Sequence, residues 1–452
     1  MTRRADHPVA GPQGFLHWML PLMLTLVAVT VLLSGRDLSQ MFADLAQGGG
    51  MYLHPAVAWI QRGVSLLLLL IAAERLLNHV AMRRPLPAPL LAWAFITYWC
   101  ATVAAPALFG SHPQISHEYL YSLAIGLAAL LATEADRERV LAAARNALFL
   151  FLVAGALLAA VVPSMVLDTA YRQGMLPGVP RFGGLATHPV ALGMFAQTFL
   201  LCLWARPFQR RWLNVLGWVL GIAVVFFAQS KTSWIAFFLC SIAMLAVRHG
   251  AGVWRRIGDP REGAFGIVAC LGAIVLTAGA VALFLFADLG AEATSFLDTA
   301  EGAQLMSMTG RDQIWVIAME EWRASPLFGY GPGLWDDQFR AAINMPNATN
   351  AHNQFMDTLA RSGGIGAAAL VAYAAVLLVL SVRAARATGG LSLALAIALA
   401  LRSISEVPLL IFGYGTEFFT HLLLLVTLAS AGAPRVHVLP AAARHGRWRP
   451  VS

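Results

Sequence analysis

The residue type best suited to proton transfer stands in a short polar run, PNATNAHNQFMD at residues 346–357, whose one histidine is His352. Histidine has an unperturbed pKa of about 6.5, so it can accept a proton from a reacting hydroxyl near neutral pH. We predict that His352 is a general base and that Asn353 and Asp357 orient it or the reacting group. Two alternatives stay open: His352 as an interfacial histidine at a helix entrance, and Asp357 as the i,i+4 partner of Arg361.

Basic side chains between the apolar runs form a second group with a chemical use. Arg181 in VPRFGGLATHP and Lys231 in FFAQSKTSW each stand within a few residues of an apolar run. The fold can therefore bring them to one anion, and a diphosphate suits two such cations. Contact with lipid headgroups and solvation in a loop are the alternatives for each charge taken singly. The same interpretations apply to Arg172, Arg311, Arg323 and Arg340.

Charged residues inside or at the ends of apolar runs form a third group, because an unpaired ion in hydrocarbon needs a cavity or a partner. Arg402 and Glu406 are four residues apart, so they can neutralise each other on one helix face. A polar cavity that opens outward is the alternative, and it would also explain Arg62, Glu118 and Glu417. Tyr330, in PLFGYGPGLW, has a ring suited to a membrane interface, and we expect it to lie beside the acceptor, the molecule that carries the reacting hydroxyl.

Apolar helices are the elements that must position these groups. The chain has 452 residues, 59% hydrophobic and 12% charged, and runs of about 20 apolar residues recur along it. We predict an all-α polytopic membrane protein that forms one integral domain over residues 1–452. The twelve predicted transmembrane helices are 15–34, 56–77, 88–109, 115–133, 139–162, 189–206, 212–228, 231–247, 264–287, 363–382, 391–409 and 412–430.

The positions of the arginines orient these spans. With both termini on the cytoplasmic side, every inner connection carries arginine, as the positive-inside rule requires. The first run follows a basic segment, but no small-residue cleavage site follows the run, so we expect a retained helix. The net charge of +8 is divided among short blocks instead of forming one basic face, which argues against a nucleic-acid partner.

This orientation leaves two outer segments that are too long to be turns, 163–188 and 288–362, and a basic cytoplasmic tail at 433–452. The second is a large periplasmic loop between spans nine and ten, and we expect the chemistry there. Within it, RDQIWVIAMEEWRAS at 311–325 predicts a helix on the membrane surface, with one apolar stripe formed by Ile314, Trp315, Ala318, Met319 and Trp322. The following PLFGYGPGLW lacks the spacing of a nucleotide-binding loop.

Five motifs, taken in order, resemble the O-antigen ligase and polymerase superfamily. They are RFGGLATHPVALG, SKTSW, TGRDQIW, PLFGYGPGLW and NAHNQFMDTLARSGGIG, and they extend from about residue 180 to residue 366. The resemblance implies a metal-independent, GT-C-like glycosyltransferase of the bacterial inner membrane that uses no cofactor. It implies transfer of a glycan from undecaprenyl diphosphate to an acceptor hydroxyl at the periplasmic face.

The resemblance also implies residue roles, in which His352 matches the family histidine and Arg181 and Lys231 face the carrier diphosphate. The family often has arginine where this chain has Lys231, and lysine offers a point charge in place of a bidentate fork. SKTSW and TGRDQIW are more typical of exopolysaccharide polymerases, so we expect a polymerase of exopolysaccharide or O-antigen. Ligation of O-antigen to lipid A core, or to protein, is the alternative.

The partners that follow are a lipid-linked glycan, a glycan or lipid A core acceptor, membrane lipids, and a flippase and chain-length regulator of the same pathway. A transporter of polysaccharide or lipid is the hypothesis from a different class. Many transporters consist of repeated halves, and the two halves of this sequence show no comparable segments. The enzyme hypothesis is therefore preferred.

Overall fold

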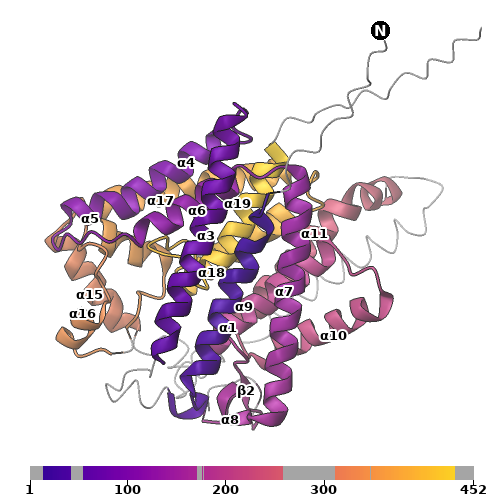
Figure 1. Cartoon of the computed structure of the whole chain (residues 1–452), viewed down its shortest axis with the longest axis horizontal. Helices are drawn as coiled ribbons and strands as arrows, with labels where there is room; N and C mark the ends of the chain where they lie inside the picture. Colours follow the sequence, from indigo (N-terminus) through magenta and orange to yellow (C-terminus); the bar gives the residue numbers. More distant parts are fainter. Residues whose placement is uncertain are drawn as a thin grey trace, which may run out of the picture.

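The computed structural model describes residues 14–41, 54–170, 176, 178–257, 311–346 and 348–432, and these residues are mostly helical (Figure 1). The predicted span 264–287, residues 288–310 of the long outer segment, the tail 433–452 and Arg172 lie outside the described residues.

The described elements follow one another along the chain as a series of helices with one short hairpin. They are η1 (Leu16–Trp18), α1 (Met19–Ser34), α3 (Pro55–Ala81), α4 (Pro89–Trp99), the π-helical turn η2 (Cys100–Ala104), α5 (Ala105–Phe109), α6 (Tyr119–Leu130), α7 (Glu134–Val161), α8 (Pro163–Val166), β1 (Leu167–Asp168), β2 (Arg181–Phe182), α9 (Pro189–Ala205), α10 (Arg211–Phe227), α11 (Lys231–Ile257), α15 (Arg311–Ala324), α16 (Asp337–Ala342), α17 (Gln354–Ala384), α18 (Leu391–Ser405) and α19 (Phe418–Gly432). β1 and β2 pair antiparallel, with Asp168 opposite Arg181.

Two short helices, α9 and α19, form the centre of the bundle. Almost every residue of each is buried, as expected for helices that are apolar on all sides. α9 packs against α7, α10 and α11, while α19 packs against α6, α7 and α18. Helices α1, α3 and α7 lie outside this centre (Figure 1). α3 and α7 expose apolar side chains such as Leu67 and Leu157.

Within the part of the chain that the structure describes, six helices are long and apolar enough to cross a membrane: Leu16–Ser34, Pro55–Ala81, Pro89–Phe109, Glu134–Val161, Lys231–Gly250 and Gln354–Ala384. Five further apolar helices, α6, α9, α10, α18 and α19, are shorter than eighteen residues. The polytopic, helical prediction is thus confirmed at this coarser level, whereas the count of twelve crossings stays a prediction.

The boundary between the last two predicted spans is wrong. The sequence predicts helices over 391–409 and 412–430, but α18 ends at Ser405 and α19 begins at Phe418. Glu406 adopts an extended backbone (φ −150°, ψ −175°), and Pro408 and two glycines follow it. Proline and glycine disfavour helix, so residues 406–417 form an irregular connection whose side chains are free of helical spacing.

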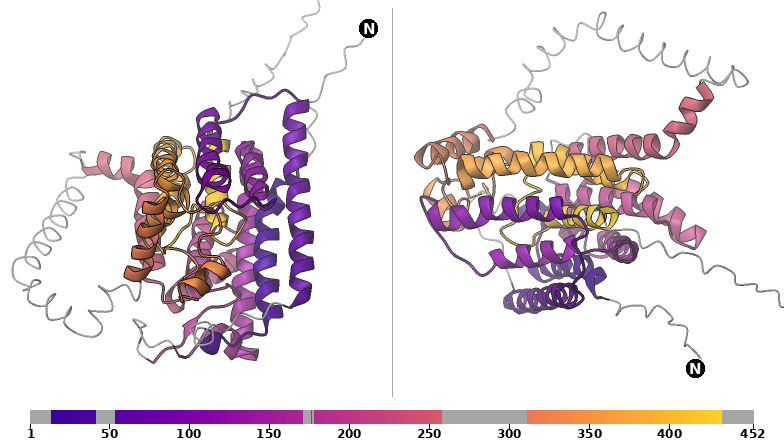
Figure 2. Two further views of the ribbon diagram at one scale, coloured as in Figure 1. Left: turned by 90° about the vertical axis from the view of Figure 1, so that its left-hand side faces the viewer. Right: turned by 90° about the horizontal axis from the view of Figure 1, so that it is seen from above.

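The long helix α17 is interrupted at Gly363, where the backbone is left-handed (φ 62°). The PLFGYG segment lies in the break and replaces lost helical hydrogen bonds: the amide of Gly364 donates to Pro326 O (2.7 Å), and that of Tyr330 donates to Ala360 O (2.8 Å). Seen from above in Figure 2, α17 (orange) runs alongside α4 and α5 (purple). The break therefore fixes the outer segment onto the bundle.

The predicted helix at 311–325 is confirmed by α15. Ile314 and Ala318 of its apolar stripe are buried in a small second core with Leu334, Trp335 and Phe339, and α15 packs against α17. Packing within the protein thus explains this part of the stripe, which we had assigned to the membrane surface.

Replacement of Gly363 by alanine is expected to destabilise the fold by at least about 2 kcal/mol, because the new Cβ would lie 2.3 Å from the Leu327 carbonyl and the backbone is left-handed. Thermal denaturation of the purified protein in detergent measures the change. Gly364→Ala is the matched control, since its Cβ would meet Pro326 O at an ordinary 3.4 Å. Equal midpoints for the two variants would contradict this account of the break.

Candidate functional site

His352 lies on a sharp turn immediately before α17. Its backbone is left-handed (φ 47°), which is uncommon for a residue other than glycine, and its amide donates to Asn350 Oδ1 at 2.7 Å. The preceding carbonyl, Ala351 O, accepts from Trp315 Nε1 of α15 at 2.9 Å. Asn353 caps α17 by accepting from the Met356 amide, and its Nδ2 donates to Ile404 O at the end of α18. The turn is thus fixed from three helices.

A buried ion pair at the start of α17 also holds this turn. Asp357 Oδ1 accepts from the Ala351 amide at 3.0 Å, while Oδ2 accepts from Arg361 Nε at 2.8 Å. Arg361 Nη1 in turn donates to Pro332 O at 2.8 Å. The i,i+4 pair that the sequence allowed is therefore present, and it positions the turn that carries His352. Asp357 has no exposed surface, and it is fully engaged by the Ala351 amide and Arg361.

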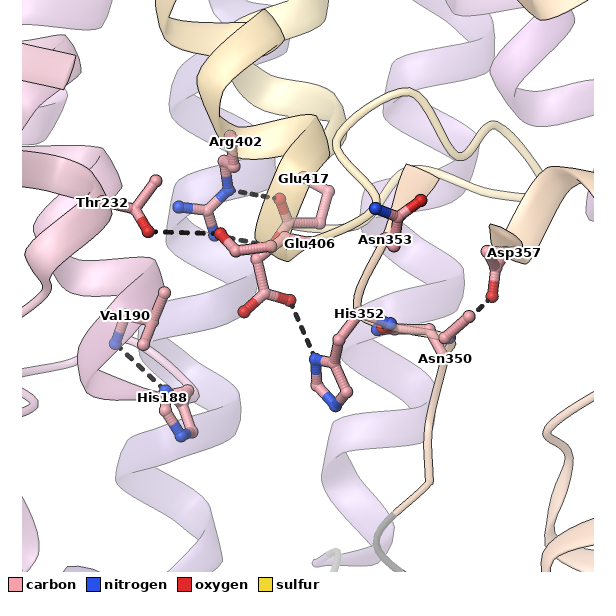
Figure 3. Close-up of polar contacts among 12 residues, drawn as sticks. His188, Val190, Thr232, Asn350, His352, Asn353, Asp357, Arg402, Glu406 and Glu417 are labelled. Atoms are coloured by element: carbon pink, nitrogen blue, oxygen red, sulfur yellow. Dashed lines mark hydrogen bonds and ion pairs between the residues drawn. The ribbon is translucent and has the colours of Figure 1, made fainter. Parts of the chain in front are cut away.

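The imidazole of His352 contacts a carboxylate from a distant part of the chain. Its Nδ1 lies 3.3 Å from Glu406 Oε2, and both side chains are partly buried (Figure 3). Burial acts to raise the pKa of Glu406, but the hydrogen bond with His352 and the charges of Arg402 and Arg311 outweigh it and lower that pKa. Glu406 is therefore ionised at neutral pH and favours a proton on Nδ1, which leaves Nε2 as the acceptor.

Arg402 pairs with Glu417 and leaves Glu406 to His352. Its guanidinium makes two parallel contacts of 2.9 Å, Nε to Glu417 Oε2 and Nη2 to Glu417 Oε1. The spacing of Arg402 and Glu406 favoured an ion pair between them on one helix face, and this prediction is wrong. α18 ends at Ser405, and Glu406 turns away from the helix face. Figure 3 shows the Glu406 carboxylate directed toward His352, with Arg402 and Glu417 on its other side.

A second histidine, His188, belongs to the same cluster of charges. It caps α9, and its Nδ1 accepts from the Val190 amide at 3.0 Å, so a neutral ring carries its proton on Nε2. Burial is the largest cause that lowers the pKa of His188, which is about 4. The charges of Arg181, His352 and Arg402 lower this pKa further, and that of Glu406 raises it. His188 is therefore neutral near pH 7. We did not single it out from the sequence, although it stands in the quoted RFGGLATHP motif.

The two cations that we expected to converge come from neighbouring elements. Arg181, in β2, is buried and donates from Nε to Ala228 O at 2.9 Å, at the end of α10. Lys231 begins α11 three residues later and is exposed, and Thr232 beside it lies 3.2 Å (Oγ1 to Oγ) from Ser405. The α10–α11 turn thus places Lys231 at the end of the bundle where α18 ends and Glu406 begins its connection.

The remaining predicted site residues are distributed differently. Arg311, at the start of α15, lies within electrostatic range of Glu406. Tyr330 packs in the second core, where its ring stacks on His112 (4.1 Å between centroids) and meets the edge of Phe339. Arg62, Glu118 and Glu417, which an outward-opening cavity would have explained together with Arg402 and Glu406, have separate surroundings. Arg62 lies over the Trp59 ring, Glu118 is exposed, and Glu417 pairs with Arg402.

Arg36, which sequence analysis also missed, supports the site indirectly. Arg36 follows α1, is buried, and donates to three carbonyl oxygens, Met165 O (3.0 Å), Gly184 O (2.9 Å) and Thr187 O (3.0 Å). Burial lowers the pKa of Arg36 to about 10. The three hydrogen bonds of Arg36 fix the position of the segment that ends at His188. The signal available in the sequence was the position of Arg36 after the first apolar run, at the end predicted to lie outside, where arginine is disfavoured.

Among the described residues, no group of three or more His, Cys, Asp or Glu side chains is arranged to hold a metal ion. Arg402 pairs with Glu417 and Arg361 with Asp357, while Arg36 and Arg181 donate to backbone oxygens.

Residues 216–371 match the family model described as O-antigen ligase. The matched segment contains Lys231, Arg311 and His352, while Arg181, His188, Arg402 and Glu406 flank it in sequence. No curated protein matches the chain. The family match confirms the resemblance to the O-antigen ligase and polymerase superfamily that the motifs indicated.

Asp357→Asn is expected to destabilise the protein by about 3 kcal/mol, because it leaves the buried Arg361 cation without its partner. Asp337→Asn is the control: Asp337 pairs with Arg340, but its side chain is 97% exposed, so a change within about 0.5 kcal/mol is expected. Thermal unfolding in detergent compares them. Similar shifts for both variants would show that burial of the Asp357 pair does not hold the turn.

Proposed function

We propose that this chain is a glycosyltransferase that moves a glycan from a polyprenyl diphosphate carrier to an acceptor hydroxyl, with His352 as general base. The observation that supports it most directly is the contact between His352 and Glu406, with cationic side chains nearby. His352 lies in the segment that matches the O-antigen ligase family, and Glu406 follows that segment. An imidazole oriented by a carboxylate is suited to accept a proton from a hydroxyl.

In the proposed reaction, the acceptor oxygen forms a bond to the anomeric carbon of the donor glycan. The bond from that carbon to the diphosphate oxygen breaks, and the diphosphate leaves with the electron pair. The hydroxyl proton passes to His352 Nε2, because Nδ1 faces Glu406. Glu406 then stabilises the imidazolium that forms. Each atom of the transfer is accounted for without a metal or a cofactor.

The leaving diphosphate gathers negative charge, and fixed positive groups lower the energy of that transition state. We assign this role to Lys231, Arg181 and Arg311, which come from the α10–α11 turn, β2 and the start of α15. Lys231 is exposed and can follow the departing group, whereas Arg181 is already fixed by Ala228 O. The finer assignment of undecaprenyl as the carrier belongs to this proposal.

For the product, we propose polymer growth, in which a second lipid-linked glycan supplies the acceptor hydroxyl. The motifs SKTSW and TGRDQIW support this choice over ligation to lipid A core. The same proposal includes twelve crossings, cytoplasmic termini and a site open to the periplasm of a bacterial inner membrane. Supplying one labelled lipid-linked donor with either acceptor distinguishes the two products directly.

Replacement of His352 by alanine is expected to lower the transfer rate by about 10²–10⁴-fold, because the general base is lost. The measurement is turnover of a defined polyprenyl-diphosphate glycan by the protein reconstituted in liposomes. His117→Ala serves as control, since His117 is an exposed histidine that contacts Tyr121 edge-on. Unchanged turnover in the His352 variant, with normal amounts of protein in the membrane, would refute the assignment.

The anion-binding role is tested at two exposed cations. Lys231→Gln is expected to reduce the rate at least tenfold, equivalent to roughly 1.4 kcal/mol, whereas Lys231→Arg retains activity because its fork still reaches phosphate. Arg323→Gln, at the exposed end of α15, is the matched control and should change the rate much less. Equal small losses at the two glutamine positions would mean that both charges merely contact headgroups.

A further inference from the structure

A pocket separate from the His352 site lies between α7 and the start of α10. Its volume is about 450 Å³. Its walls come from one face of α7 and from the segment that links α9 to α10; the lining residues are Arg145, Asn146, Phe149, Leu150, Phe208, Gln209, Arg210 and Leu213. His188 caps the other end of α9, about 25 Å away by the rise of a seventeen-residue helix.

The lining of this pocket changes from polar to apolar along α7. Arg145 and Asn146 form one end, and Phe149 and Leu150, about one turn further along the helix, form the other. Leu150 is 66% exposed, so the apolar end opens to the surface of the bundle that a membrane would cover. A polar end followed by an apolar wall matches a molecule with a headgroup and a hydrocarbon chain.

The polar end carries a positive charge that its own hydrogen bonds do not cancel. Arg145 is 8% exposed, and its Nη1 donates to Arg206 O (2.6 Å) and Pro207 O (2.8 Å). Its Nε and Nη2 donate to Asn146 Oδ1 at 3.1 and 2.9 Å. All of these acceptors are neutral oxygens. A guanidinium has five N–H groups, so one on Nη2 is left for a further acceptor.

A second cation and a helix terminus add to this charge. Arg210 is exposed in the same pocket, immediately before the first turn of α10. Among the described residues, no side chain caps that turn, so its amide groups add the positive end of a seventeen-residue helix dipole. The guanidinium of Arg145 lies 4.1 Å from the centre of the Phe208 ring, which holds the linking segment against α7.

We propose that this pocket binds one anionic phospholipid, with the lipid phosphate between Arg145 and Arg210 and an acyl chain along Phe149, Leu150 and Leu213. Charge complementarity selects an anionic headgroup over a zwitterionic one, since a choline group would bring a cation to two arginines. The acyl contacts select a lipid over a soluble phosphate. The proposal does not depend on the reaction assigned to the His352 site.

Native mass spectrometry of the full-length protein in detergent tests the proposal, with phosphatidylglycerol and phosphatidylcholine of identical chains as probes. We expect one phosphatidylglycerol to bind more tightly than phosphatidylcholine. Arg210→Gln should weaken phosphatidylglycerol about fivefold, the effect of one basic residue at an anionic lipid. It should weaken phosphatidylcholine less, because the choline cation offsets the charge of that lipid's phosphate. Arg145→Gln is not the primary variant, because Arg145 also holds the end of α9.

Arg211→Gln is the matched control, because Arg211 is also exposed and adjacent in sequence but does not line the pocket. It should alter phosphatidylglycerol affinity by less than about twofold, since its charge is outside the site. Equal affinity for the two lipids, or equal losses in the two arginine variants, would overturn the proposal. Displacement of the lipid by glycerol phosphate at comparable concentration would also overturn it, because acyl contacts would then contribute nothing.

Discussion

The buried carboxylate of Asp357 is the constraint on which the geometry around His352 depends. It accepts from the Ala351 amide on one oxygen and from Arg361 on the other, and Arg361 donates to Pro332 O. The ion pair thus joins the turn, the start of α17 and the PLFGYGPG segment. A carboxylate without exposed surface is tolerated when it is fully hydrogen-bonded and paired. The left-handed backbone of His352 can persist because these contacts determine the turn from several sides.

Electrostatic pairing then decides which carboxylate reaches the histidine. Arg402 is buried in α18 and forms a bidentate ion pair with Glu417, the last residue of the irregular connection 406–417. The charge of Arg402 is thereby neutralised. Glu406 is left at the end of α18 and turns toward His352. One connection thus supplies two acids with different partners. The site assembles where α18 ends, α9 begins and the outer segment meets the bundle.

Local pattern in the sequence predicted the elements better than their contacts. The stripe in 311–325 predicted α15, and the i,i+4 spacing of Asp357 and Arg361 predicted their pair, because both signals lie within one helix. The partner of Arg402 could not be predicted in the same way. It required knowing that the helix stops at Ser405 and that Glu417 returns to it. His188 and Arg36 were missed for a related reason: most of the charged groups near His188 and the carbonyl oxygens that Arg36 contacts come from segments more than a hundred residues away.

The break at Gly363 has a mechanical consequence for a protein in a bilayer. Residues 364–384 are about 30 Å long as a helix, close to the thickness of the hydrocarbon layer. A helix of this length adjusts to thicker or thinner membranes by tilting. The chain is not continuous helix through Gly363, and residues 354–362 are hydrogen-bonded to the PLFGYG segment. We infer that the break takes up such tilting, so that the position of His352 changes little with membrane thickness.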